Sequence, residues 1–198
     1  MLYLENYNGF DAYADLKSWK SALKNGDIIT IEKMIKSGFN INKRFTENNF
    51  KSITALSFAF FYEQYDVVKL LIKNDINLDV FDPINNTYFI SSVVIKYYII
   101  SRDIGKNDIL SILNLMIKKG ADVNLINKDG DTALILAAKY TINKLIYILI
   151  DAGSDWNIMN KDDQDFIDIL GDFTFLIKKY PTKYREYKKK KTSSKFNL

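Results

Sequence analysis

The apolar residues of this chain recur at the spacing of amphipathic helices, and the pattern itself is repeated along the sequence. In residues 127–159, Thr132 opens one short apolar stretch, and a second stretch follows with apolar residues three and four positions apart. The same order occurs upstream, where Thr54 opens a matching stretch. Each unit therefore predicts two short helices and an extended loop, and the chain is predicted to be all-α.

Residues that begin and end helices stand at the expected places in these units. Gly38, Gly120 and Gly153 follow the second apolar stretches, where a left-handed residue can close a helix. Thr54 and Thr132 precede the first stretches, where a hydroxyl oxygen can accept a hydrogen bond from a free N–H of the opening turn. These signals predict helix-turn-helix repeats.

The repeated residues resemble the motif of ankyrin-repeat proteins over about residues 15–172. Residues 129–134 and 136–138 resemble the opening of the family's repeat, and residues 120–124 resemble its ending. The resemblance implies an ankyrin-repeat solenoid of stacked helix-turn-helix units joined by hairpin-like loops. The chain departs from the family at its proline position (Ala55, Tyr88, Ala133), its histidine position (Ser57, Ile90, Ile135) and one glycine position (Asp75).

The repeat frame predicts an ankyrin-repeat domain at residues 1–178 and a basic tail at residues 179–198. The units within the domain are placed at 11–43, 44–80, 81–126 and 127–159, with a closing cap at 160–178. The third unit holds 12 additional residues, so we expect both of its helices to be longer, with a connection at residues 101–107. A smaller insertion of about four residues lengthens the loop near residues 44–51.

The family resemblance also implies where a partner protein would bind, namely at the loop tips and the exposed face of the first helix of each pair. The candidate partner-binding residues at these positions are Phe50, Lys51, Ile53, Phe61, Tyr62, Phe81, Ile84, Asn86, Val94, Ile95, Lys128, Asp131, Lys139 and Tyr140. Exposed aromatic side chains carry much of the binding energy of protein interfaces. Phe50, Phe61, Tyr62 and Phe81 are therefore the expected centre of the surface.

Burial is the alternative interpretation for several of these aromatic residues. Phe58, Phe60 and Phe61 can pack between neighbouring helices, as aromatic residues at helical spacing usually do. Tyr97 and Tyr98 can likewise be core residues of the lengthened helix pair.

The tail differs in composition from the repeats. Residues 178–198 hold nine basic residues and one acidic residue, so this segment carries +8, and the rest of the chain carries −4 of the net +4. We expect a flexible tail whose candidate residues are Lys183, Arg185, Lys188, Lys189, Lys190 and Lys191. One interpretation is contact with phosphate groups of nucleic acid or of an anionic membrane surface; the other is a solvated, lysine-rich end.

Composition narrows the possible chemistry. The chain has no His and no Cys, which excludes Ser-His-Asp and Cys-His catalysis and His or Cys metal sites. Asp162, Asp163, Asp165 and Asp168 are close in sequence, but negative charge at the start of a helix explains them without catalysis. We therefore expect no enzyme activity, no catalytic residue, no metal and no cofactor.

The sequence carries no pattern of a secretory signal and no apolar stretch long enough to cross a bilayer. We expect a monomer in the cytoplasm that binds another protein. Delivery to a host cell is left open.

Overall fold

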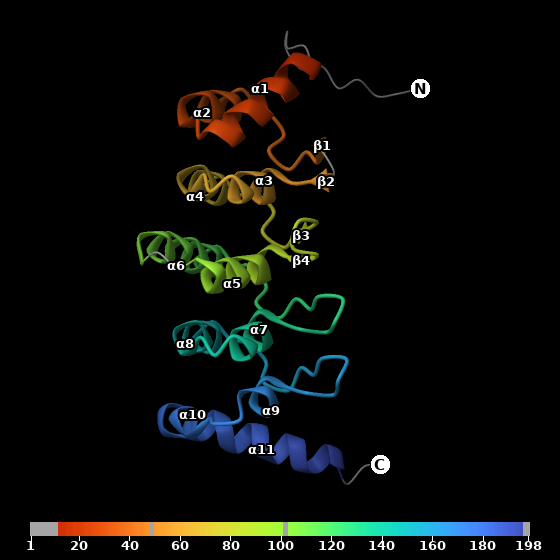
Figure 1. The fold of residues 1–198 in the computed structure, drawn as a ribbon, viewed down its shortest axis with the longest axis vertical. Coiled ribbons are helices and arrows are strands. Elements are labelled where there is room, and N and C mark those ends of the chain that lie inside the picture. Colours follow the sequence, from red (N-terminus) through yellow and green to blue (C-terminus); the bar gives the residue numbers. More distant parts are fainter. Residues whose placement is uncertain (1–11, 48–49, 101–102, 196–198) are drawn as a thin grey trace. The chain divides into compact units, whose positions relative to one another are not determined.

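The computed structural model describes residues 12–47, 50–100 and 103–195 (Figure 1). The chain forms two compact units, residues 1–77 and residues 78–198. The described residues hold eleven helices and two small antiparallel sheets. The mostly helical fold confirms the all-α prediction in its coarse form, while the two sheets were not predicted as strands.

The first unit contains two helix pairs separated by a hairpin. Its elements are α1 (Ala12–Asn25), α2 (Ile28–Lys36), β1 (Phe45–Glu47), β2 (Phe50–Ile53), α3 (Ala55–Phe61) and α4 (Tyr65–Lys73). Helix α1 packs against α2 and α3, and α2 packs against α4. Trp19, Leu23, Ile31, Leu56 and Leu71 are fully buried and form the core of this unit.

The second unit continues the alternation of hairpins or loops with helix pairs. Its elements are β3 (Phe81–Asp82), β4 (Thr87–Tyr88), α5 (Phe89–Ile99), α6 (Asp103–Lys118), α7 (Ala133–Lys139), α8 (Asn143–Asp151), α9 (Phe166–Leu170), α10 (Thr174–Lys179) and α11 (Pro181–Lys195). Helix α7 packs against α5, α8 and α9. Apolar side chains of consecutive pairs therefore share one core.

Equivalent stretches of sequence form equivalent helices. Helices α3 and α7 each have seven residues, and α4 and α8 each have nine. Thr54 and Thr132 cap α3 and α7 as predicted, because each hydroxyl oxygen accepts a hydrogen bond of 3.2 Å from the N–H three residues later.

The insertion lengthens both helices of the third pair, as predicted. Helix α5 has 11 residues and α6 has 16. The predicted connection at residues 101–107 is too long, because α6 already begins at Asp103. Residues 101 and 102 lie outside the described residues, as do residues 1–11 of the predicted domain, residues 48–49 of the lengthened loop and residues 196–198 of the tail.

A repeated hydrogen bond joins each loop to the next. The side-chain oxygens of Asn42, Asp79 and Asn124 stand at the same position of successive repeats, and each accepts a backbone N–H from the following repeat. The donors are the N–H groups of Asn77, Asp122 and Asp155, at 2.8, 2.9 and 2.8 Å. Loop backbone that no helix can satisfy is thus bonded at regular intervals.

The prediction of a flexible tail is wrong for residues 181–195, which form helix α11. Pro181 ends α10 but also starts α11, since a proline at the first helical position needs no N–H partner and already has a helical φ. The hydroxyl of Tyr187, which lies on this helix, is bonded inside the second unit, and its side chain is buried.

We predict that Gly130→Ala destabilises the protein more than Gly153→Ala. Both glycines have positive φ, of 79° and 96°, so each alanine costs about 1–2 kcal/mol of backbone strain. A Cβ at position 130 would also lie 2.9 Å from Cα of Asn160, whereas position 153 is open. Urea unfolding of both variants measures the difference, and equal losses would contradict the role of this close approach.

Candidate functional site

The predicted aromatic residues of the first unit come together on one surface. The Phe50 and Phe61 ring centroids lie 5.8 Å apart, and those of Phe61 and Tyr62 lie 5.1 Å apart. The amine of Lys24, on α1, lies 5.0 Å from the centroid of the Tyr62 ring. We call Lys17, Lys20, Lys24, Phe50, Phe61 and Tyr62 the lysine–aromatic surface.

Helix α3 separates buried from exposed aromatic side chains. Phe58 and Phe60 are buried, as the packing interpretation expects, but Phe61 is 47% exposed. Phe61 is the last residue of α3, and Tyr62 is its C-cap residue, so both side chains stand where the helix leaves the core. Aromatic side chains are enriched at protein interfaces.

Two other candidate residues of this unit, Ile53 and Lys51, are not part of the lysine–aromatic surface. Ile53 is fully buried because it ends β2 on the inward side, immediately before the cap of α3, so its assignment to a binding surface is wrong. Lys51 is exposed and remains available as a candidate.

A hollow of about 420 Å³ adjoins these side chains. It is lined by Leu16, Lys17, Lys20, Ser21, Lys24, Glu47 and Phe58. Lys20 forms an ion pair with Glu47 across it. The hollow therefore has cations and one carboxylate around an apolar floor.

The structure contradicts two of the candidates in the second unit. Asp131 is buried, and its carboxylate accepts hydrogen bonds from Lys139, at 2.6 Å, and from Asn160, at 3.2 Å. Val94 is fully buried in α5. Both side chains hold the fold together and cannot meet a partner.

The remaining candidates of the second unit lie on its surface to different degrees. Phe81, Ile84, Ile95 and Tyr140 are half-buried, whereas Asn86, Lys128 and Lys139 are exposed. Tyr140 stacks on Tyr98, with ring centroids 4.2 Å apart. Tyr98 is 57% exposed, so its interpretation as a core residue is wrong, and the sequence pattern did not identify it as part of this stacked pair.

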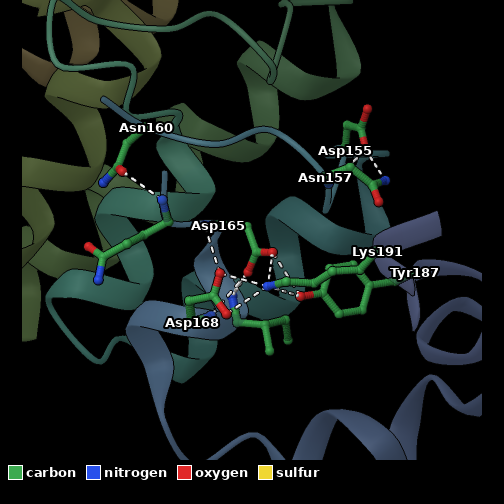
Figure 2. Close-up of polar contacts among 9 residues, drawn as sticks. Asp155, Asn157, Asn160, Asp165, Asp168, Tyr187 and Lys191 are labelled. Atoms are coloured by element: carbon green, nitrogen blue, oxygen red, sulfur yellow. Dashed lines mark hydrogen bonds and ion pairs between the residues drawn. The ribbon is translucent and has the colours of Figure 1, made fainter. Parts of the chain in front are cut away.

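A cluster of four polar residues fixes α11 to the rest of the second unit (Figure 2). Lys191 donates hydrogen bonds to Asp165 and Tyr187, at 2.7 and 2.8 Å, and to both carboxylate oxygens of Asp168, each at 2.6 Å. The Tyr187 hydroxyl donates to Asp165 at 2.8 Å. We call Asp165, Asp168, Tyr187 and Lys191 the Asp165 cluster.

The carboxylates of this cluster also start helix α9. Asp165 accepts hydrogen bonds from the N–H groups of Ile167 and Asp168, and the Asp168 side chain accepts one from the N–H of Asp165. This is a capping box. It supports the interpretation of these acidic residues as charge at a helix start.

The cluster changes the acidity of its members. Partial burial alone would raise the pKa of Asp168, but hydrogen bonds from Lys191 and from the Asp165 backbone outweigh it, and the net pKa is below the ordinary value of 3.8. Burial disfavours the charged Lys191 amine, yet hydrogen bonds to Asp165, Asp168 and Tyr187 raise its pKa. Burial is the main reason that the pKa of Tyr187 is raised. At neutral pH the Lys191 amine is therefore charged and faces the ionised Asp168 carboxylate.

The six basic residues of α11 from Lys183 to Lys191 fall into two groups. Lys191 is bound in the Asp165 cluster, and Lys183 donates to the carbonyl of Ile150 and lies 5.6 Å from the Trp156 ring centroid. Arg185, Lys188, Lys189 and Lys190 are exposed. Sequence reasoning missed this division because the carboxylate and carbonyl partners of the bound lysines are 23 to 33 residues away in the chain.

The described part of the chain holds no group of three or more His, Cys, Asp or Glu side chains arranged for a metal ion. No described helix is both long enough and apolar enough to cross a membrane.

No protein-family model matches the chain, and no curated protein matches it.

We predict that Lys191→Met weakens the docking of α11. The substitution leaves the buried Asp165 carboxylate without its cation, which costs about 1–3 kcal/mol. Lys189→Met is the matched control, because Lys189 is exposed on the same helix. Urea unfolding and amide hydrogen exchange of α11 measure the effect, and equal exchange in the two variants would show that the cluster does not hold the helix.

The same cluster predicts a loss of stability in acid. The folded-state pKa of Asp168 is lowered. The stabilisation of the folded state by the ionised Asp168 carboxylate is therefore fully present above the unfolded-state pKa and is lost as pH falls through the folded-state pKa. The difference in stability between wild type and Lys191→Met should therefore shrink below about pH 4. A difference that stays constant down to pH 2 would contradict this linkage.

Proposed function

We propose that the chain is a non-enzymatic protein–protein interaction module of the ankyrin-repeat kind. The observation that carries the proposal is the lysine–aromatic surface, where Phe61 is 47% exposed next to Phe50, Tyr62 and Lys24. The recurring helix pairs, threonine caps and loop-to-loop hydrogen bonds support the repeat architecture on which this surface stands.

The way in which the aromatic side chains are held suits binding. Phe50 lies on β2 and Phe61 at the end of α3, so regular hydrogen bonding holds the backbone that carries each ring, and the two rings contact each other. Little conformational freedom is then lost when a partner covers them. A preformed aromatic surface can thus supply a large share of an interface's binding energy.

The proposal assigns no catalytic role to the polar residues. The Asp165 cluster is engaged in capping α9 and docking α11, and Asp131 is engaged with Lys139 and Asn160. These contacts account for the buried carboxylates without a reaction.

We predict that the triple variant Phe50→Ala, Phe61→Ala, Tyr62→Ala loses a partner that the wild-type chain captures from its source cell. Removal of three aromatic side chains from an interface weakens binding by about tenfold or more. The control is Ile29→Ala, which removes a side chain that is 81% exposed in the same unit. Circular dichroism verifies that both variants fold, and equal capture by both would contradict the proposed surface.

A second function is supported by the ordered α11. We propose that its exposed basic face contacts phosphate groups of nucleic acid or of an anionic membrane surface. Arg185, Lys188 and Lys189 line a shallow hollow of about 580 Å³ together with Thr192 and Ser193. In the described part of the chain none of these three cations forms an ion pair.

We predict that changing Arg185, Lys188 and Lys189 together to Gln removes this interaction. For a duplex DNA of 20 base pairs, the slope of log affinity against log salt should decrease by about one for each cation that contacts phosphate. Vesicles containing phosphatidylserine test the membrane alternative. The control changes Lys128, Lys144 and Lys161 to Gln, because these lysines are exposed elsewhere in the second unit. Equal binding by the two variants would contradict a role for the basic face of α11.

A further inference from the structure

We infer that the hollow beside α1 binds an acidic peptide segment that carries one large apolar side chain. The inference rests on the proposed protein-binding function and names the class of partner. It is carried by the side chains around the hollow, which combine cations, aromatic rings and an apolar floor.

The cations of the hollow come from one face of α1. Lys17, Lys20 and Lys24 are three, four and seven residues apart, so their side chains leave the helix on the same side over about 10 Å. Lys20 is held by Glu47, and the Lys24 amine lies over the Tyr62 ring. These two amines are therefore positioned before a partner arrives, which lowers the entropy that binding costs.

The apolar part of the site lies between the cations and the core. Leu16 and Phe58 line the hollow, and the Phe58 ring contacts the Tyr62 ring, with centroids 5.0 Å apart. Phe61 and Phe50 continue the aromatic surface next to it. Phe58 is buried, so the rings that a large apolar side chain of a partner can cover are those of Phe61, Phe50 and Tyr62. Carboxylates on either side of that side chain can meet Lys17 and Lys24.

Glu47 favours a peptide over a nucleic acid as the occupant. Its carboxylate lines the hollow among the lysines. A phosphate backbone would place a negative group beside it at every step. A peptide can instead place carboxylates beside the lysines and a backbone N–H beside Glu47, since a carboxylate accepts hydrogen bonds only.

The test uses the full-length chain labelled with ¹⁵N and a terminally blocked pentapeptide in which two acidic residues stand on each side of one phenylalanine. We expect amide shifts confined to α1, β1, β2 and α3, and affinity that falls as NaCl is raised from 20 to about 300 mM. The peptide with alanine in place of phenylalanine should bind about tenfold or more weakly. The peptide with amides in place of all four carboxylates should show no saturable binding.

Variants of the protein test whether Lys17 and Lys24 are the cations that contact the peptide. Lys17→Gln with Lys24→Gln should weaken peptide binding about threefold to tenfold, as expected for two partly exposed ion pairs. The matched control is Lys33→Gln with Lys36→Gln, because these lysines are exposed on α2 of the same unit and should leave the affinity unchanged. Equal weakening in both pairs would show general charge attraction and overturn the inference.

Other outcomes separate this inference from the proposed function. No saturable shift with the acidic peptide, or displacement of the peptide by a short RNA at equal concentration, would overturn the acidic-peptide assignment. If a cellular partner is lost on triple alanine substitution of Phe50, Phe61 and Tyr62 but kept by Lys17→Gln with Lys24→Gln, the protein-binding function stands and the acidic partner class is wrong.

Discussion

The structure depends on satisfying the backbone of its loops with side-chain oxygens of Asn and Asp. Helices satisfy their own N–H groups, whereas backbone carbonyls satisfy only part of the loop and hairpin backbone between helix pairs. Asn127 and Asn160 each accept two N–H groups of their own loop, and Asn42, Asp79 and Asn124 each accept one from the next repeat. Because an Asn or Asp side chain accepts an N–H group at the same position of successive repeats, the loops keep their spacing and the helix pairs can share apolar faces.

Polar side chains that hold the loops together are not available to contact a partner. Asp131 lies in the loop before α7, yet it bonds Asn160 of the following loop and Lys139, the last residue of α7. Phe61 and Tyr62 have no such task, because they stand at the end of α3, where the chain leaves the core. In the first unit, the side chains that stay accessible in the folded chain include the Phe61 ring and the Lys17 and Lys24 amines beside α1.

Features that depend on neighbours in sequence were predictable, and features that depend on distant partners were not. Thr54 and Thr132 bond the N–H three residues later, so a short sequence motif predicts them. The lengthening of α5 and α6 follows from counting residues. Whether Ile53 faces inward depends on how β2 pairs with β1, and the apolar pattern of so short a strand does not specify it.

The tail is the clearest case in which contacts with residues distant in sequence order a segment whose own sequence predicts a flexible end. A run of lysines repels itself and predicts a solvated end, but Lys191 has two carboxylates 23 and 26 residues earlier, and Tyr187 covers one of them. When Lys191 and Lys183 are bonded to the rest of the second unit, Arg185, Lys188 and Lys189 lie on the exposed side of the same helix. The contacts that hold α11 thus also determine which of its cations face the solvent. Packing of α11 against the second unit therefore places these three cations on one fixed face of the helix.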